Sequence, residues 1–408
     1  MENIIDSNFY RSLKSVPDLL NDISNHIEFN GHLSNHNKHA VVALARLSAD
    51  INLINKFYFE YIECTTYGCG LEPPKISKYH ITKQNWKDYL GKRTSYTSYY
   101  EFFKSEIEIN GLNRVLSEYL PQLLPGWVSS LTHAAIHLGW GLDIKNKCMI
   151  TEGLAYLCFS FISCHPEKVL KEDNQVFNSP IHSFLNILEE IDKDPQQFKH
   201  YIDSILKKEE EENNFNFHPE LKRSGTQLRI ATVLKYGHPL IYLEQAWISN
   251  LSTEESWNEL FYLTTLIYLH HSYNFVVLHL LTSLHALKEI AFYLNKEEEQ
   301  ECLKNYWIGM NCILFAMVTM PNKNEFNQLI DKYYNKFDDF NDINISKYWK
   351  NIIESAFLEK EEHNPKMVYV LRKMWEESGY KSIYRIAANQ FTTTPGLPES
   401  FKQMPNES

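Results

Sequence analysis

The stretch that decides the fold runs from Ala40 to Ile54 and reads AVVALARLSADINLI. Apolar side chains recur in it at every third or fourth position, namely Ala40, Val41, Leu44, Leu47, Ile51 and Ile54. A helix of 3.6 residues per turn brings such positions onto one face and leaves Arg46 and Lys56 on the other. The stretch therefore predicts a helix that buries its apolar face in a core.

The same helical period runs through most of the chain. It is found in residues 99–119, 129–138, 152–164, 181–191, 256–269, 275–294, 301–318, 345–357 and 367–375. Strict alternation over six or more residues, which marks a half-buried strand, is hard to find. Asp192 to Pro195 separates two helical stretches, and Ser252 with Glu255 has the spacing of a capping box. These patterns predict an all-α fold, either a single large helical domain or a domain of two helical lobes.

Three segments are irregular. Residues 68–93 contain Gly68, Gly70, Gly91 and a Pro-Pro pair, which predict a long loop. The charge run at 207–214 is typical of a solvated helix end. Residues 392–408 hold three prolines and predict an extended or disordered tail. We therefore place the helical domain at residues 1–391 and the tail at 392–408.

Composition and charge limit the function. The chain has 408 residues, of which 44% are apolar and 22% are charged, as in an ordinary globular protein. Forty basic and 51 acidic side chains give a net charge of −11, which argues against binding to a nucleic-acid backbone. We therefore expect no nucleic-acid partner. The sequence assigns no oligomeric state.

The sequence also favours a cytoplasmic location. Residues 1–6 lack the basic start and apolar run of a secretory signal. The most apolar runs, at 153–164 and 312–320, are shorter than the roughly 20 residues that span a bilayer. Seven cysteines are scattered, and the spacing of Cys64 and Cys69 fits neither a zinc site nor a redox pair. We expect no membrane span and a reducing compartment.

Familiar nucleotide-binding and nucleophile motifs are missing. Gly139-Trp140-Gly141 lacks the third glycine of a dinucleotide fingerprint, because Ile144 occupies that place, and no strand pattern precedes it. The sequence has no phosphate-binding loop and no Gly-x-Ser-x-Gly elbow. A Rossmann-type flavin or nicotinamide enzyme is therefore not expected.

Histidines on the apolar helices are the unusual feature. The chain has 17 histidines, and several lie within helical stretches: His36, His39, His133, His137, His279, His285 and His363. A single histidine on an apolar face is usually a core residue with a satisfied hydrogen bond. Helical bundles, however, build metal sites from ligands that project inward from facing helices. Histidine ligands without cysteine suit iron, copper, nickel or zinc.

Four sequence blocks resemble the questin oxidase-like family. The first is Asn35-His36 followed by Ala40-Val41-Val42-Ala43-Leu44. The second is His133-Ala134-Ala135-Ile136-His137-Leu138-Gly139-Trp140-Gly141, followed by Glu152-Gly153-Leu154-Ala155-Tyr156. The third is 275–287 with His279-Leu280-Leu281-Thr282-Ser283, and the last is Glu362-His363-Asn364-Pro365-Lys366 followed by Leu371-Arg372. The blocks occur in the family's order.

The resemblance implies an all-α protein with one non-haem iron held between helices. The implied ligands are His36, His133, His279, His363 and Lys366, the lysine being carboxylated by carbon dioxide. Members of the family act with dioxygen on aromatic polyketides of the anthraquinone type, and NADPH is a candidate electron donor. Carboxylation requires a neutral amine, so the pKa of Lys366 must be lowered by burial or by a neighbouring cation.

Some ligand positions have competitors. His39 competes with His36, and His137 competes with His133. Extending the first helix backwards puts His36 in line with its apolar face, whereas His39 falls off that face. For His39, His137 and His285 we favour a core role or a hydrogen bond that orients a ligand. His270 and His271 precede the third block, and we expect them to be structural or solvent-facing.

Pro365 lies between His363 and Lys366, where an uninterrupted helix would otherwise be expected. Either a helix begins there, with Asn364 as its cap and Pro365 as its first residue, or the helix kinks. The first option places Lys366 near a helix N-terminus, where the helix dipole favours a neutral amine and an anionic carbamate.

The leading hypothesis is an iron-dependent oxygenase that acts on a small hydrophobic aromatic or quinone substrate. The alternative is a non-catalytic helical protein that binds a metal or another ligand. A metal-free scaffold with buried histidines is a third hypothesis.

Overall fold

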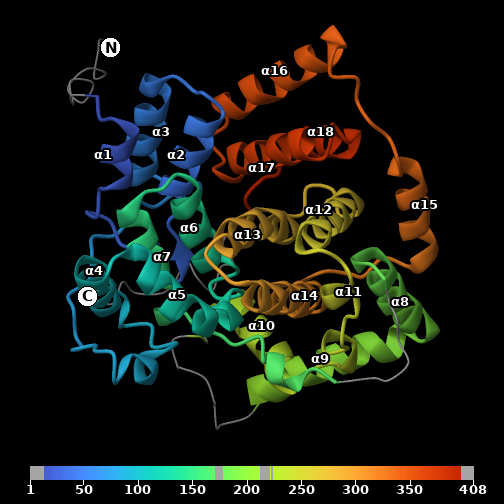
Figure 1. The fold of residues 1–408 in the computed structure, drawn as a ribbon, viewed down its shortest axis with the longest axis horizontal. Coiled ribbons are helices and arrows are strands. Elements are labelled where there is room, and N and C mark those ends of the chain that lie inside the picture. Colours follow the sequence, from blue (N-terminus) through green and yellow to red (C-terminus); the bar gives the residue numbers. More distant parts are fainter. Residues whose placement is uncertain (1–12, 171–177, 212–220, 222–223, 397–408) are drawn as a thin grey trace.

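The centre of the computed structural model is helix α13 (Phe275–Ala291), and its sequence explains that position. Every residue from Val277 to Leu287 is buried. A helix that is apolar on all sides must be covered on all sides. Four helices pack against it: α6 (His133–Asp143), α12 (Thr253–His270), α14 (Lys296–Met317) and α17 (His363–Glu377) (Figure 1).

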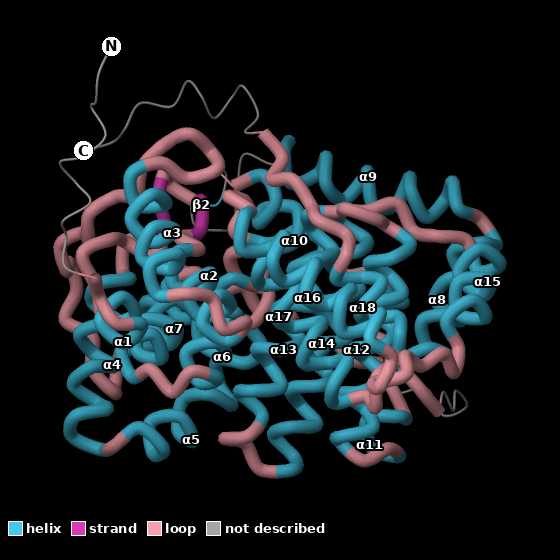
Figure 2. The backbone as a smooth tube through the Cα atoms, turned by 90° about the horizontal axis from the view of Figure 1, so that it is seen from above, coloured by secondary structure: helices cyan, strands magenta, loops and turns pink. Residues whose placement is uncertain are grey.

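The structure describes residues 13–170, 178–211, 221 and 224–396. One end of the molecule holds six further helices: α1 (Val16–Leu20), α2 (Asn37–Arg46), α3 (Ile51–Glu63), α4 (Tyr96–Asn110), α5 (Leu112–Leu123) and α7 (Lys147–Phe159) (Figures 1 and 2). The opposite end holds α8 (Pro180–Lys193), α9 (Pro195–Glu211), α11 (Trp247–Asn250) and α15 (Lys323–Tyr333). The remaining helices are α10 (Gly225–Tyr236), α16 (Ile343–Leu358) and α18 (Ser382–Ala388).

Other regular structure is sparse in the described part of the chain. Strands β1 (Glu28–Phe29) and β2 (Leu33–Ser34) form a two-residue antiparallel hairpin. Short 3₁₀ turns lie at Trp86–Tyr89, Leu124–Gly126, Pro166–Lys168 and Pro239–Ile241. The prediction of a single all-α domain is therefore confirmed. No helix among the described residues is both long and apolar enough to cross a bilayer.

The boundaries marked in the sequence agree with the structure. The Asp192–Pro195 stretch divides α8 from α9, and Ser252 forms the predicted capping box with Glu255 at the start of α12. The charge run forms the end of α9 up to residue 211, and residues 212–214 lie outside the described part. Of the predicted tail, 392–396 are described and 397–408 are not.

The stretch from Ala40 to Ile54 is two helices, so the prediction of one continuous helix was wrong. Helix α2 ends at Arg46, Ser48 adopts a left-handed φ of 64°, and Asp50 caps α3 by accepting a hydrogen bond from the Asn52 backbone N–H. The apolar period continues across the break because the two helices pack against each other and both bury their apolar faces in the core. Asp is a common N-cap, so Asp50 was the available signal.

Two other predicted helices are also interrupted or shortened by residues with positive φ. Residues 99–119 are divided at Gly111, whose φ of 80° suits glycine and ends α4 before α5 begins. Residues 129–138 begin as an irregular turn, since Ser130, Leu131 and Thr132 all have positive φ. Helix α6 therefore starts at His133, later than the pattern predicted.

Two glycines set the distance between the helices at the centre. A Cβ on Gly139 would lie 2.3 Å from the backbone oxygen of Ala286, and a Cβ on Gly153 would lie 2.5 Å from the Leu138 Cα. Only glycine allows such an approach of two backbones. Helix α6 is therefore in direct backbone contact with both α13 and α7.

Replacing Gly139 by alanine should separate α6 from α13. We expect Gly139→Ala to lower the free energy of unfolding by about 1–3 kcal/mol, because the added methyl group overlaps backbone and not a flexible side chain. Denaturant titration measures the change. The control is Gly225→Ala in α10, whose Cβ would meet nothing within 4 Å and which should be neutral or slightly stabilising. Equal stability of the two variants would contradict the prediction.

Candidate metal centre

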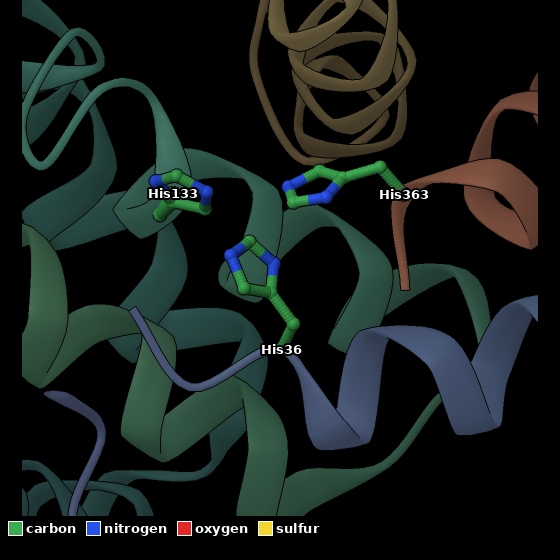
Figure 3. A group of neighbouring side chains, drawn as sticks. All are labelled: His36, His133 and His363. Carbon is green, nitrogen blue, oxygen red and sulfur yellow. The ribbon is translucent and has the colours of Figure 1, made fainter. Parts of the chain in front are cut away.

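Four histidines that are distant in sequence lie around one point between α2, α6, α13 and α17. They are His36, His133, His279 and His363, and each is at least 95% buried. Around this ring of side chains the ring centroids are 4.5 Å apart for 36–133, 4.6 Å for 133–279, 4.9 Å for 279–363 and 4.5 Å for 363–36. Figure 3 shows His36, His133 and His363 pointing toward one another. Nitrogen atoms of these three lie within 4.8 Å of each other.

Helix starts place three of the four imidazoles. His133 and His363 are the first residues of α6 and α17, and His36 occupies the N-cap position of α2 without capping it through its side chain. His279 instead projects from the second turn of α13. Side chains at helix starts can point along the space between helices, so histidines from separate helices converge there.

His133 and His279 face each other through unprotonated nitrogens. The His133 Nδ1 donates to the Ser130 carbonyl, and the His279 Nδ1 donates to the Phe275 carbonyl at 2.7 Å. A carbonyl only accepts, so the proton of each neutral ring is on Nδ1. The two Nε2 atoms, 3.0 Å apart, therefore point lone pairs at each other. Burial holds the pKa of both rings well below the usual histidine value, with Lys366 adding to the effect at His133 and His133 adding to it at His279.

His363 contributes a third lone pair. Its Nδ1 donates to the Glu361 carboxylate at 2.5 Å, and its backbone N–H donates to the other oxygen of that carboxylate at 2.8 Å. The His363 Nε2 is buried and has no hydrogen-bond partner among the described residues. Burial, and then Lys366, lowers its pKa far below the usual value, so this nitrogen is unprotonated. An orphaned buried acceptor costs stability unless a donor or a cation meets it.

Lys366 completes the group. Its side chain is 1% exposed, and its Nζ lies 2.8 Å from the Nδ1 of His36. Burial lowers the pKa of this amine to about 8, while Glu362 and Glu361 act in the opposite direction. Because this pKa is below that of an ordinary lysine, more of the amine is neutral near pH 7 than it would be at the surface.

The start of α17 differs from the sequence prediction. The helix begins at His363 with Glu362 as its N-cap, two residues before the predicted first residue, Pro365. Pro365 therefore lies in the first turn, where a backbone N–H has no intrahelical partner and its loss has no cost. Because the turn is intact, His363 and Lys366 lie on the same side of the helix.

These residues fit a transition-metal ion. Lone pairs of several imidazoles converge in a space closed to solvent, and histidine nitrogens suit iron, copper, nickel or zinc. The carboxylates of Glu361 and Glu362 lie beside His363, with donor atoms of the three within 4.8 Å of one another. Burial raises the pKa of both carboxyl groups, that of Glu362 to about 7 with Glu361 adding to the effect, and a cation among the imidazoles would favour their charged forms.

The competing histidines are bonded elsewhere. The His39 Nε2 lies 2.9 Å from the His137 Nδ1, and the His137 Nε2 lies 3.0 Å from a Glu152 oxygen. Both Glu152 oxygens accept from the Lys38 amine at 2.7 Å. These hydrogen-bonded side chains lie about one helical turn further along α2 and α6 than His36 and His133.

The other predicted histidines lie outside the cluster. The His285 Nε2 is 3.3 Å from an Asp143 oxygen, which also accepts from the Tyr369 hydroxyl. His270 and His271 make an edge-to-face contact with each other at the end of α12, where they are partly exposed. These positions agree with the structural roles that we favoured.

A second buried network holds the turn that presents His133. Ser130 donates through its hydroxyl to Glu28 at 2.7 Å, Tyr156 donates to the same oxygen at 3.0 Å, and Arg93 forms an ion pair with Glu28. Ser130 is also the residue whose carbonyl accepts from His133. The network therefore fixes both the backbone and the ring orientation.

Sequence analysis missed these supporting residues. Glu28 and Arg93 lie in segments without a clear pattern, and only the hairpin and the loop fold them together. Glu361 gave a local signal, because an acidic residue just before a helix is a common capping arrangement. Glu152 was part of a recognised block, but nothing in the sequence joined it to Lys38.

Fold and site together define an all-helical protein with a buried, nitrogen-rich centre that fits a transition-metal ion. A family model described as questin oxidase-like matches residues 33–371. The chain therefore belongs to the questin oxidase-like family, which confirms the resemblance of its four blocks. Membership supports an oxidoreductase at the level of the family. No curated protein matched the chain in sequence.

Replacing Lys38 tests how much its ion pair with Glu152 contributes to the stability of the fold. Burial alone would raise the pKa of Glu152, but Lys38 and His137 lower it below the usual value. We expect Lys38→Met to reduce the free energy of unfolding by about 3–5 kcal/mol at pH 7, because a buried carboxylate loses its cation. Denaturant titration at several pH values measures the loss.

The pH dependence has a definite sign. A carboxyl group with a lowered folded pKa stabilises the fold above its unfolded pKa, about 4.3, and this contribution fades as the pH falls through the folded pKa. The difference between wild type and Lys38→Met should therefore shrink toward acid. Lys350→Met, which breaks an exposed pair with Glu354, is the control and should change stability by less than about 1 kcal/mol. A pH-independent loss in Lys38→Met would contradict the role of Glu152.

Proposed function

We propose that this protein is a cytoplasmic, non-haem iron-dependent oxidoreductase that acts with dioxygen on an aromatic polyketide-like or quinone substrate. The metal ligands in this proposal are His36, His133, His279, His363 and a carboxylated Lys366. NADPH is the candidate electron donor. Bound iron would supply the one-electron chemistry that allows dioxygen to react with an organic molecule.

One observation carries the proposal. The Nε2 atoms of His133 and His279 point lone pairs at each other across 3.0 Å, and the buried Nε2 of His363 lacks a hydrogen-bond partner among the described residues. Three unprotonated nitrogens directed at one closed space repel one another unless a cation lies among them. Core packing alone gives no reason for this arrangement, because apolar side chains would fill the space at less cost.

The residues around the cluster have distinct tasks in this proposal. Backbone carbonyls of Ser130 and Phe275 and the carboxylate of Glu361 each hold the Nδ1 proton of one imidazole, which keeps the Nε2 lone pair available. Such partners fix the tautomer and the orientation of a ligand histidine. The surrounding apolar helices exclude water from the site.

Lys366 has the environment that carboxylation requires. Only the neutral amine attacks carbon dioxide, and burial lowers the pKa of Lys366 to about 8. The amine nitrogen bonds to the carbon of carbon dioxide, the electron pair of one C=O π bond moves to that oxygen, and the nitrogen gives a proton to a base, so the product is an anionic oxygen donor. The carbamate would add the negative charge that four neutral imidazoles lack.

Element analysis together with dioxygen consumption tests the proposal. Wild type should contain about one iron per chain and should consume dioxygen with quinones or anthrones, with NADPH tested as the donor. His279→Ala and His363→Ala should lose most of the iron and the turnover. The matched control is His238→Ala, which changes a histidine packed among Phe198, Tyr201 and Phe315 and should keep the iron.

Each result separates one hypothesis from the others. Iron without turnover on any tested aromatic compound would favour the non-catalytic metal- or ligand-binding protein. A fresh, iron-replete preparation with no bound metal would leave the metal-free scaffold. Full iron and full turnover in His279→Ala would contradict the ligand assignment.

The carboxylated lysine makes a separate prediction. Iron loading of metal-depleted protein should increase with added bicarbonate, and isotope-labelled bicarbonate should give a carbamate carbon signal by NMR. Lys366→Ala should lose most of the iron, and acetate or propionate should restore part of it by supplying the missing oxygen donor. Loading of wild type that does not depend on bicarbonate, with no carbamate signal, would exclude the modification.

A further inference from the structure

The last described segment of the chain, residues 390–396, lies against the start of α17. It follows α18 without regular secondary structure, and we call it the C-terminal strap. Thr392 is buried within it, Thr393 is exposed and Thr394 is partly buried. The family model ends at residue 371, so the strap lies outside the matched residues. Its contacts are therefore a property of this chain that the family match does not describe.

Hydrogen bonds tie the strap to α17 and to α12. The Thr392 backbone N–H donates to the Asn364 side-chain oxygen at 2.9 Å, and the Asn364 side-chain amide donates back to the Thr392 carbonyl at 3.1 Å. The Thr392 hydroxyl donates to the Tyr273 carbonyl at 2.6 Å. The Tyr268 hydroxyl donates to the Gln390 carbonyl at 2.9 Å. The strap therefore joins the first turn of α17 to α12 and to the connection that precedes α13.

The elements joined by the strap present two of the candidate ligands. His363 is the first residue of α17 and directly precedes Asn364. Tyr273 lies just before Phe275, whose carbonyl accepts the hydrogen bond from the His279 Nδ1. The strap therefore ties together the backbone segments that hold His363 and His279.

Thr394 completes the hydrogen bonds of the Glu361 carboxylate. An ionised carboxylate accepts about four hydrogen bonds. Three come from the first turn of α17: from the His363 backbone N–H at 2.8 Å, from the Asn364 backbone N–H at 3.2 Å and from the His363 Nδ1 at 2.5 Å. The Thr394 hydroxyl donates the fourth, to the same oxygen that accepts from the His363 ring. Among these four donors, only Thr394 comes from a distant part of the chain.

The fourth hydrogen bond restricts the carboxylate. Glu361 is only 8% exposed, and a buried acceptor that loses its donor costs free energy. Rotation of the carboxylate would reduce that cost, but it would also move the acceptor away from the His363 Nδ1. Since an outer partner fixes the tautomer and the direction of a ligand histidine, the ring would then be free to carry its proton on either nitrogen.

We propose that the C-terminal strap is a positioning element of the candidate metal centre, in which Thr394 acts through Glu361 on His363. The hydroxyl holds the carboxylate, the carboxylate holds the Nδ1 proton, and the Nε2 lone pair is thereby kept directed at the cluster. The reciprocal pair of Thr392 and Asn364 holds the strap in place. The inference rests on the proposed function for the metal, but not for the orientation of the imidazole.

Metal affinity of Thr394 variants tests this role. The dissociation constant of Co(II) alone is measured by absorption spectroscopy on the full-length, metal-depleted chain. Thr394→Val has nearly the same shape but no donor, and it should raise this constant by about tenfold, the lower end of the effect of losing an outer partner of a ligand. Thr394→Ser keeps the donor and should bind like wild type. Thr393→Val, at the exposed neighbouring position, is the matched control and should also bind like wild type.

A second measurement needs no metal. NMR of metal-depleted protein labelled with ¹⁵N-histidine reports which nitrogen of His363 carries the proton, and His363→Ala assigns its signals. Wild type should carry the proton on Nδ1, whereas Thr394→Val should show a mixture of both tautomers. In a Glu361→Gln background, Thr394→Val should raise the Co(II) constant no further, because the carboxylate through which Thr394 acts is gone.

Circular dichroism of each variant confirms that the fold is intact. Weaker Co(II) binding and mixed tautomers in Thr394→Val, with Thr394→Ser and Thr393→Val unchanged, support the inference. An unchanged His363 tautomer in Thr394→Val, or an equal loss of Co(II) affinity in Thr393→Val, overturns it. Wild type that binds neither iron nor Co(II) would remove the proposed function, and the tautomer in Thr394→Val would then decide the inference by itself.

Discussion

Lone pairs on buried imidazoles impose the constraint around which this molecule is built. A neutral histidine in a helical core is satisfied by one donor and one acceptor. Here the Nδ1 protons of His133, His279 and His363 are all donated to groups outside the cluster, namely two backbone carbonyls and the Glu361 carboxylate. Their inner nitrogens are left facing one another in a space closed to water. Buried polar groups left in this state are costly, so the surrounding structure must hold them there against the cost.

Close helix packing supplies that rigidity. Backbone contact at Gly139 fixes α6 against α13, and contact at Gly153 fixes α7 against α6. His133 lies on α6 and His279 on α13, so the 3.0 Å between their Nε2 atoms depends on how closely these two helices approach. Charged groups then anchor the flanks: Glu28 holds the turn before His133, and Glu361 holds the start of α17.

Local pattern was sufficient for much of this description. The 3.6-residue period predicted the helical class, the histidines on apolar faces indicated a possible metal site, and the resemblance of the four blocks implied His36, His133, His279, His363 and Lys366 as its ligands. It could not locate the breaks at Ser48 and in the turn before His133, because an apolar period continues when two helices pack on the same core. Nor could it pair Glu28 with Arg93 or join Lys38 to Glu152. Sequence fixes which side chains share a helix face, whereas contacts between helices depend on how closely and at what angle the backbones pack, and only the tertiary structure decides that.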